Sequence, residues 1–189
     1  DTDRSRGLGD VYKRQALYVI LGVVVLLGLW LMSSYNKLIR LREMVKNAMG
    51  QIAANVESRW DALKSLIDAT KKYSAHEAET LEKVIQARGS LNSSSSVKDI
   101  EADDNMFTQA LSRLAVVVEA YPDLKANTLY LNTMDKIDEY EQDVKNSRMI
   151  YNDTVTRFNR TMLVFPVVLI SRMMGFTAVS YTHLTLPTT

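Results

Sequence analysis

The residues that could perform chemistry are few in this chain, and their spacing fits no catalytic or metal-binding motif. His76 and Glu77 begin like a His-Glu-x-x-His zinc motif, but Thr80 stands where the second histidine is required. A di-iron bundle needs paired Glu-x-x-His motifs, and the residue three before His76 is Tyr73. The chain has no cysteine, which excludes thiolate nucleophiles and cysteine-ligated metals. We therefore expect no catalytic residue, no cofactor and no metal ion, and we expect that the chain is not an enzyme.

Composition narrows the class of protein further. The serine tract at residues 93–96 lacks the Gly-x-Ser-x-Gly frame of a nucleophile, and no glycine-rich loop could hold a phosphate. Lys and Arg number 23 against 22 Asp and Glu, so no net field would recruit nucleic acid. Only 7 Gly and 3 Pro interrupt 189 residues, which argues against sandwiches, barrels and nucleotide-binding α/β folds. The composition predicts an all-α protein.

Both ends of the chain resemble translated sequencing-library adapter. Residues 1–15 and 179–189 lack a helical or strand pattern, and both back-translate to adapter sequence. The alternative is an ordinary disordered tail at each end. We interpret both segments as non-native and exclude them from fold reasoning, which also implies that the native termini are missing.

An uncharged apolar run at residues 16–32 is the first element that we expect to be native. As a helix it would extend roughly 25 Å, the short end of what crosses a bilayer. Trp30 and Tyr35 lie near its downstream end, where amphipathic rings favour the membrane interface. A buried core helix usually shows polar punctuation, and a cleaved signal peptide needs a small-x-small site that does not follow Met32. We therefore predict a retained transmembrane helix.

Positive charge downstream of this helix predicts its orientation. Lys37, Arg40, Arg42 and Lys46 follow within about 15 residues, the range over which Lys and Arg set topology. This predicts a single-pass membrane protein with the bulk of the chain in the cytoplasm. The competing outcome is a domain on the outer face.

Residues 33–178 are predicted to form one helical domain. Apolar residues recur every three or four positions over 38–56 and again over 63–84, which indicates amphipathic helices. Between them, Arg59-Trp60-Asp61 could form a tight turn, with Asp61 as a helix cap, or a kink. Ser74 and Glu77 have the spacing of a capping box but could equally be a solvated pair.

Two more helices complete the predicted domain. Residues 89–96 form the clearest loop, and a third helix is expected to start at Asp103 or Asp104. Tyr121-Pro122 ends that helix, and a long fourth helix covers residues 134–162. The sequence thus predicts an antiparallel up-and-down four-helix bundle that follows the N-terminal transmembrane helix.

Charged residues recur on the apolar sides of two of these helices. Glu141 and Arg148 are seven residues apart on the fourth helix, Glu77 lies on the second, and Arg88 lies seven residues after Leu81. A partly buried polar layer of these four residues would fix the register of the helices. Alternatively, the charges flank the stripe and extend to water.

The end of the fourth helix is predicted to return to the membrane. In an up-and-down bundle it would lie beside Tyr35, where the apolar segment from Phe165 to Phe176 could rest in the headgroup region together with Trp30. The alternative is a segment packed on the domain core.

Several short motifs, in order, resemble those of the LemA family. The resemblance rests on Tyr35-Asn36-x-Leu38, Tyr73-x-x-His76-Glu77, Gln86-Ala87-Arg88, the segment Glu119 to Ala126, and Tyr151-Asn152-x-x-Val155-x-x-Phe158-Asn159. It implies a bacterial protein anchored in the inner (cytoplasmic) membrane, with a small external N-terminus and an antiparallel four-helix domain. The role of the family is not established, so the resemblance supplies no catalytic residue.

These features predict a structural or protein-interaction module of the bacterial envelope. The expected partners are the lipid bilayer, an unidentified protein and a second copy of the chain through the fourth helix, with no nucleic acid. The alternative is a membrane-associated enzyme or enzyme subunit whose active site is completed by a partner chain.

Overall fold

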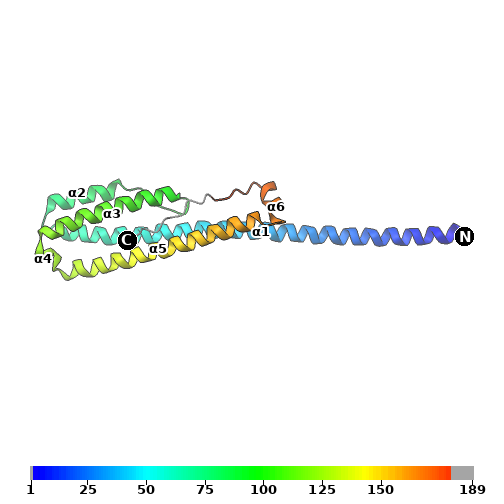
Figure 1. The fold of residues 1–189 in the computed structure, drawn as a ribbon, viewed down its shortest axis with the longest axis horizontal. Helices are drawn as coiled ribbons and strands as arrows, with labels where there is room; N and C mark the ends of the chain where they lie inside the picture. The colour runs from blue at the N-terminus through cyan, green and yellow to red at the C-terminus, as the bar shows by residue number, and fades with distance from the viewer. Residues whose placement is uncertain (1, 180–189) are drawn as a thin grey trace. The chain divides into compact units, whose positions relative to one another are not determined.

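The computed structural model describes the backbone of residues 2–179 and the side chains of residues 12–179. Every regular element in this part of the chain is an α-helix, which confirms the all-α prediction. The described residues form these helices, labelled in Figure 1: α1 (Thr2–Thr70), α2 (Ala75–Ala87), α3 (Val97–Ala120), α4 (Pro122–Lys125), α5 (Thr128–Leu163) and α6 (Val167–Met173).

The helices belong to two compact units. Unit 1 contains the first part of α1, up to Arg42, and residues 158–178, which include the end of α5 and α6. Unit 2 is built on residues 43–157, which include the rest of α1, the helices α2 to α4 and most of α5.

Helix α1 is longer than the sequence pattern predicts. It continues through Arg59, Trp60 and Asp61 to Thr70, so of the two alternatives, a tight turn or a kink, the turn is wrong, and Asp61 does not cap a new helix. No Gly or Pro occurs between residues 51 and 70, and the buried stripe keeps its helical spacing across the expected break. The same helix includes residues 2–15, for which no helical pattern was recognised.

Two connections separate α1, α2 and α3. Ser74 is the N-cap of α2, but its side chain makes no capping hydrogen bond. Helix α3 begins at Val97 with Ser96 as N-cap, and the side chains of Ser96 and Asp99 form a complete capping box. The predicted cap at Asp103 or Asp104 is therefore wrong, because an earlier pair already satisfies the free N–H groups.

The two serine caps give a matched test of capping. Ser96→Ala should lower the free energy of unfolding by about 1 kcal/mol, because it removes the acceptor for the N–H of Asp99. Ser74→Ala should cost clearly less, since Ser74 has no such bond to lose. Urea unfolding followed by circular dichroism measures both. Equal losses for the two variants would contradict the assigned capping box.

Proline marks the remaining helix ends. Helix α3 ends at Ala120 before Pro122, as predicted, and Pro122 occupies the first turn of α4. Helix α5 begins at Thr128, six residues before the predicted start, and ends at Leu163 before the cis peptide bond between Phe165 and Pro166.

Each unit has its own buried residues. In unit 2, Leu63, Leu66 and Ile67 of α1 are buried, as are residues of α2, α3 and α5. In unit 1, the core contains Leu38, Phe158, Met162 and Ile170. Residues 16–32 of α1 are exposed throughout, and α1 is the one helix in the described part that is long and apolar enough to cross a membrane.

Candidate functional site: a buried arginine–carboxylate cluster

Arg59 of α1 is the centre of a charged cluster inside unit 2. Its side chain is only 2% exposed. Its Nη1 donates to Glu141 Oε1 of α5 at 2.7 Å, and its Nη2 donates to Asp103 Oδ2 and Asp104 Oδ1 of α3, both at 3.1 Å. One guanidinium group therefore joins three helices that are distant in sequence.

Aromatic rings enclose this guanidinium group. Its carbon lies 4.1 Å from the centre of the Phe107 ring, a cation–π distance. Trp60 packs edge-on against Phe107, with ring centres 5.1 Å apart and ring planes at 90°. The Trp60 Nε1–H donates to both carboxylate oxygens of Asp103, at 3.0 and 3.1 Å. Asp103 is thus held by both a cation and an indole.

A second buried arginine extends the cluster along α5. The side chain of Arg148 is 3% exposed and its Nη2 donates to Asp104 Oδ2. Asp104 therefore bridges two arginines, and it remains partly open to solvent. We name Arg59, Asp103, Asp104, Glu141 and Arg148 the ion cluster.

Arg88 forms a separate pair at the edge of the ion cluster. It donates to Glu57 of α1, and its guanidinium carbon lies 5.1 Å from the centre of the Trp60 ring. The side chain of Arg88 is 13% exposed and that of Glu57 is 52% exposed. This pair is open to solvent on the carboxylate side.

Burial has a measurable electrostatic consequence at Asp103. Loss of hydration raises the pKa of its carboxyl, against the opposing effects of the Trp60 hydrogen bond and the Arg59 charge. Because the pKa in the folded state lies above that in the unfolded state, the contribution of Asp103 to stability is greatest when it is protonated. That contribution declines as the pH rises through the two values.

The structure places the four predicted polar-layer residues differently from one another. Arg148 is buried, Glu141 is partly buried and Arg88 lies at the edge of the ion cluster, but Glu77 is exposed on α2. Glu141 pairs with Arg59 on α1, and Arg148 pairs with Asp104 on α3. The charges of α5 are therefore paired with α1 and α3, and not with α2 as the predicted polar layer requires. Ala78 and Leu81 are the buried residues of α2, which turns Glu77 outward.

Three members of the site were missed from sequence. By sequence alone, the segment around Arg59 fits either a turn or a kink, and Asp103 or Asp104 fits a helix cap. A signal was present, because Asp103 lies three residues after Ile100 and four before Phe107, on the same apolar stripe. A carboxylate at a stripe position predicts a buried cation opposite it.

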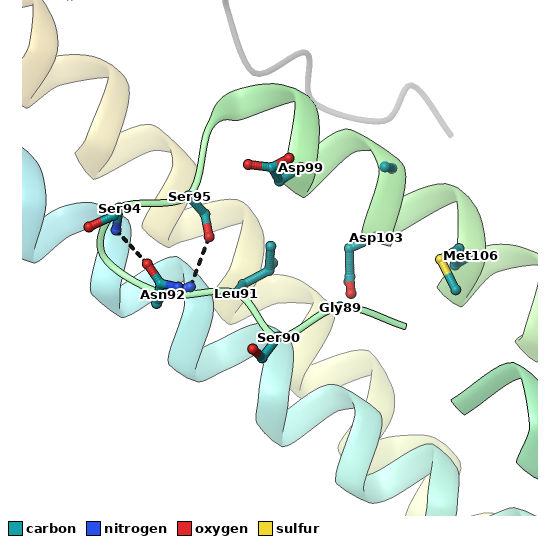
Figure 2. Close-up of a pocket in the computed structure, with 10 residues that line it drawn as sticks. Gly89, Ser90, Leu91, Asn92, Ser94, Ser95, Asp99, Asp103 and Met106 are labelled. Carbon is teal, nitrogen blue, oxygen red and sulfur yellow. Dashed lines mark hydrogen bonds between the residues drawn. The ribbon is translucent and has the colours of Figure 1, made fainter. Parts of the chain in front are cut away.

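A cavity of about 470 Å³ opens beside the ion cluster. Figure 2 shows the loop between α2 and α3 along one side of it, with Asp99, Asp103 and Met106 of α3 on the other. The loop is held by Asn92, whose N–H donates to Ser95 Oγ and whose Oδ1 accepts from the Ser94 N–H.

The chemistry of the ion cluster is that of a structural lock. The three carboxylates accept hydrogen bonds from Arg59, and two of them also from Trp60 or Arg148. Asp103 and Asp104 are thereby engaged on both carboxylate oxygens, whereas Glu141 accepts from Arg59 on one oxygen and is 28% exposed. In the described part of the chain, no three His, Cys, Asp or Glu residues are grouped to hold a metal ion.

The residues predicted for a membrane interface lie in unit 1. Trp30 and Tyr35 on α1 are exposed, as is Phe165, and Phe176 is half-buried. The rings of Tyr35 and Phe176 make an edge contact with centres 6.1 Å apart. Tyr35 and Phe176 are therefore brought together, whereas no ring contact links Trp30 or Phe165 to them within the described residues.

Long helices, two compact units and a buried ion cluster define an all-helical protein with a long apolar extension of its first helix. The LemA family profile matches residues 48–188, and the chain belongs to the LemA family. Protein LemA of Metamycoplasma hominis is 29% identical over 137 residues, which cover 69% of this chain and 60% of that protein. The chain therefore spans less than two thirds of the length of this relative.

Proposed function

We propose that this chain is a single-pass protein of the bacterial inner membrane, anchored by residues 16–32. The observation that carries the proposal is that this uncharged segment forms a continuous helix whose apolar side chains are all exposed. In water such a surface would be strongly unfavourable, whereas in lipid it is matched to its surroundings and its backbone is satisfied.

We further propose that α2, α3, the second part of α1 and most of α5 form an antiparallel up-and-down four-helix bundle. The supporting contacts are the hydrogen bonds of Arg59 to α3 and α5, and that of Asn55 on α1 to Ser147 on α5 at 2.6 Å. The ion cluster would select one register of the helices, because any shift strands buried charges. Glu77 lies outside this lock, on the exposed face of α2.

The proposed role is that of a structural or protein-interaction module without catalytic activity of its own. Support comes from the engagement of the cluster carboxylates with arginine, which fits a rigid scaffold better than a reactive site. An unidentified protein of the envelope, or a second copy of the chain, is the proposed partner.

A single-cysteine variant tests the anchor and its orientation together. The chain has no cysteine, so Ser94→Cys in the exposed loop creates a unique thiol. We expect the variant to stay in membranes washed with alkaline carbonate, because an apolar helix resists extraction that releases peripheral proteins. We expect a membrane-impermeant maleimide to label the thiol only after cells are opened, since Lys37, Arg40, Arg42 and Lys46 favour a cytoplasmic bundle.

Carbonate extraction and maleimide labelling test the anchor and its orientation independently. Release of the chain by carbonate would refute the membrane anchor. Retention with ready labelling of intact cells would refute the cytoplasmic orientation alone, and would place the bundle on the outer face. Ser112→Cys on α3 is a second exposed position in unit 2 and should be labelled in the same way as Ser94→Cys.

A further inference from the structure

The segment around α6 exposes an unusual amount of apolar surface. Val164 is 53% exposed, Phe165 76%, Leu169 56%, Met173 87% and Met174 55%. Such side chains close together in sequence exceed the scattered exposure of an ordinary soluble surface. This surface needs a partner that is itself apolar.

The opposite side of α6 is firmly packed inside unit 1. Ile170 and Ser171 are buried, and Ser171 Oγ donates to the carbonyl oxygen of Met162 at 3.2 Å. Helix α6 is therefore held against the end of α5, and its exposed apolar side chains are a fixed outer face. We name the exposed residues Val164, Phe165, Leu169, Met173 and Met174 the α6 face.

The ring contact between Tyr35 and Phe176 shows where the end of the α6 segment lies along α1. Phe176, just after α6, meets the ring of Tyr35. Tyr35 follows the last residue of the uncharged run, Met32, by three positions. The end of the α6 segment thus lies beside α1 where the apolar run gives way to polar residues.

Beyond residues 1–15, which we interpret as non-native, the charges of unit 1 have a single sign. Residues 16–42 and 158–178 contain no Asp or Glu. They contain five basic residues, all exposed: Lys37, Arg40, Arg42, Arg160 and Arg172. A surface with apolar side chains and only positive charges complements anionic lipid headgroups above acyl chains. A second copy of unit 1 would carry the same positive charges and repel it.

We propose that the α6 face is a second membrane contact, which lies in the interface of an anionic bilayer beside the anchor. This inference rests on the proposed membrane anchor. The α6 face enters the boundary between headgroups and acyl chains, and Arg160 and Arg172 pair with lipid phosphates. The contact holds unit 1 to the membrane surface at a second point, beside the anchor.

Site-specific labelling of the full-length chain tests the second contact. Leu169→Cys carries an environment-sensitive dye on the α6 face, and Ser94→Cys carries the same dye in the unit 2 loop. Each chain is reconstituted in vesicles of phosphatidylcholine, with or without phosphatidylglycerol, that contain a lipid-borne quencher. In anionic vesicles we expect the Leu169 dye to be quenched at least about twofold more strongly than the Ser94 dye, since it lies at acyl-chain depth.

Salt and arginine substitutions test whether the positive charges of unit 1 contribute to the second contact. Salt at about 1 M, where the Debye length is about 3 Å, should reduce the quenching of the Leu169 dye. Arg160→Gln with Arg172→Gln should lower the ratio of inserted to free α6 roughly 25-fold, because each cation near an anionic surface contributes about fivefold. Arg113→Gln with Arg157→Gln, two exposed arginines of unit 2, is the matched control and should leave quenching unchanged.

The outcomes separate this proposal from the membrane anchor. A chain that no longer floats with vesicles after alkaline carbonate would refute the anchor. A chain that floats, but whose Leu169 dye is quenched no more than the Ser94 dye, would overturn the second contact alone. Equal quenching in neutral and anionic vesicles, unaffected by salt in the unaltered chain, would overturn the anionic lipid as the partner.

Discussion

Arg59→Met should lower the free energy of unfolding of unit 2 by about 3–5 kcal/mol, the cost of removing one partner from a buried ion pair. Methionine keeps much of the length and apolar contact of the arginine stem, so the loss reports the missing charge rather than a cavity. Without Arg59, Glu141 loses its ion pair, and Asp103 keeps only its bond to Trp60. Urea unfolding of the detergent-solubilised chain, followed by Trp60 fluorescence, measures the effect.

The pH dependence of the same variant checks the cause. Burial already raises the pKa of Asp103, and loss of the Arg59 charge favours its protonated form further, so the deficit of Arg59→Met should grow as the pH rises and shrink in acid. Arg113→Met on the exposed face of α3 is the control and should change stability by no more than about 0.5 kcal/mol. A pH-independent deficit would attribute the loss to packing and not to charge.

Trp60→Ala should cost about 3–5 kcal/mol, because it removes one of the largest fully buried side chains and leaves a cavity. It also removes the support of Phe107 and the N–H donor to Asp103. Circular dichroism follows the unfolding of this variant, since its buried fluorophore is gone.

Trp60→Phe separates the two roles of the indole. A phenyl ring can retain contact with Phe107 but cannot donate to Asp103, so the expected loss is about 1–3 kcal/mol, that of an unsatisfied buried acceptor. Trp30→Phe in the apolar part of α1 is the matched control and should leave the unfolding of unit 2 within about 0.5 kcal/mol of the parent chain. Equal losses for Trp60→Phe and Trp30→Phe would show that the hydrogen bond to Asp103 adds nothing.

Local signals in the sequence predicted some helix ends and not others. Pro122 marks the end of α3 correctly, because proline disfavours the helical conformation of the residue before it. The turn that the sequence left open near Asp61 does not form, because Asp is only weakly unfavourable inside a helix and burial of Trp60 and Leu63 outweighs it. At Ser74 the capping signal is only half realised: α2 starts after this residue, but the Ser74 side chain forms no capping hydrogen bond.

The sequence by itself determined what depends on composition and periodicity: an all-α fold, the uncharged run at residues 16–32, the serine loop and the LemA resemblance. It also indicated that Arg148 and Glu141 lie toward the apolar side of a helix, since a spacing of seven returns to the same face. Only the tertiary structure decided the partners of these charges. Arg59 is 44 positions from Asp103 and 82 positions from Glu141 in the sequence. A helical pattern specifies which face of a helix is buried, but not which distant helix covers that face.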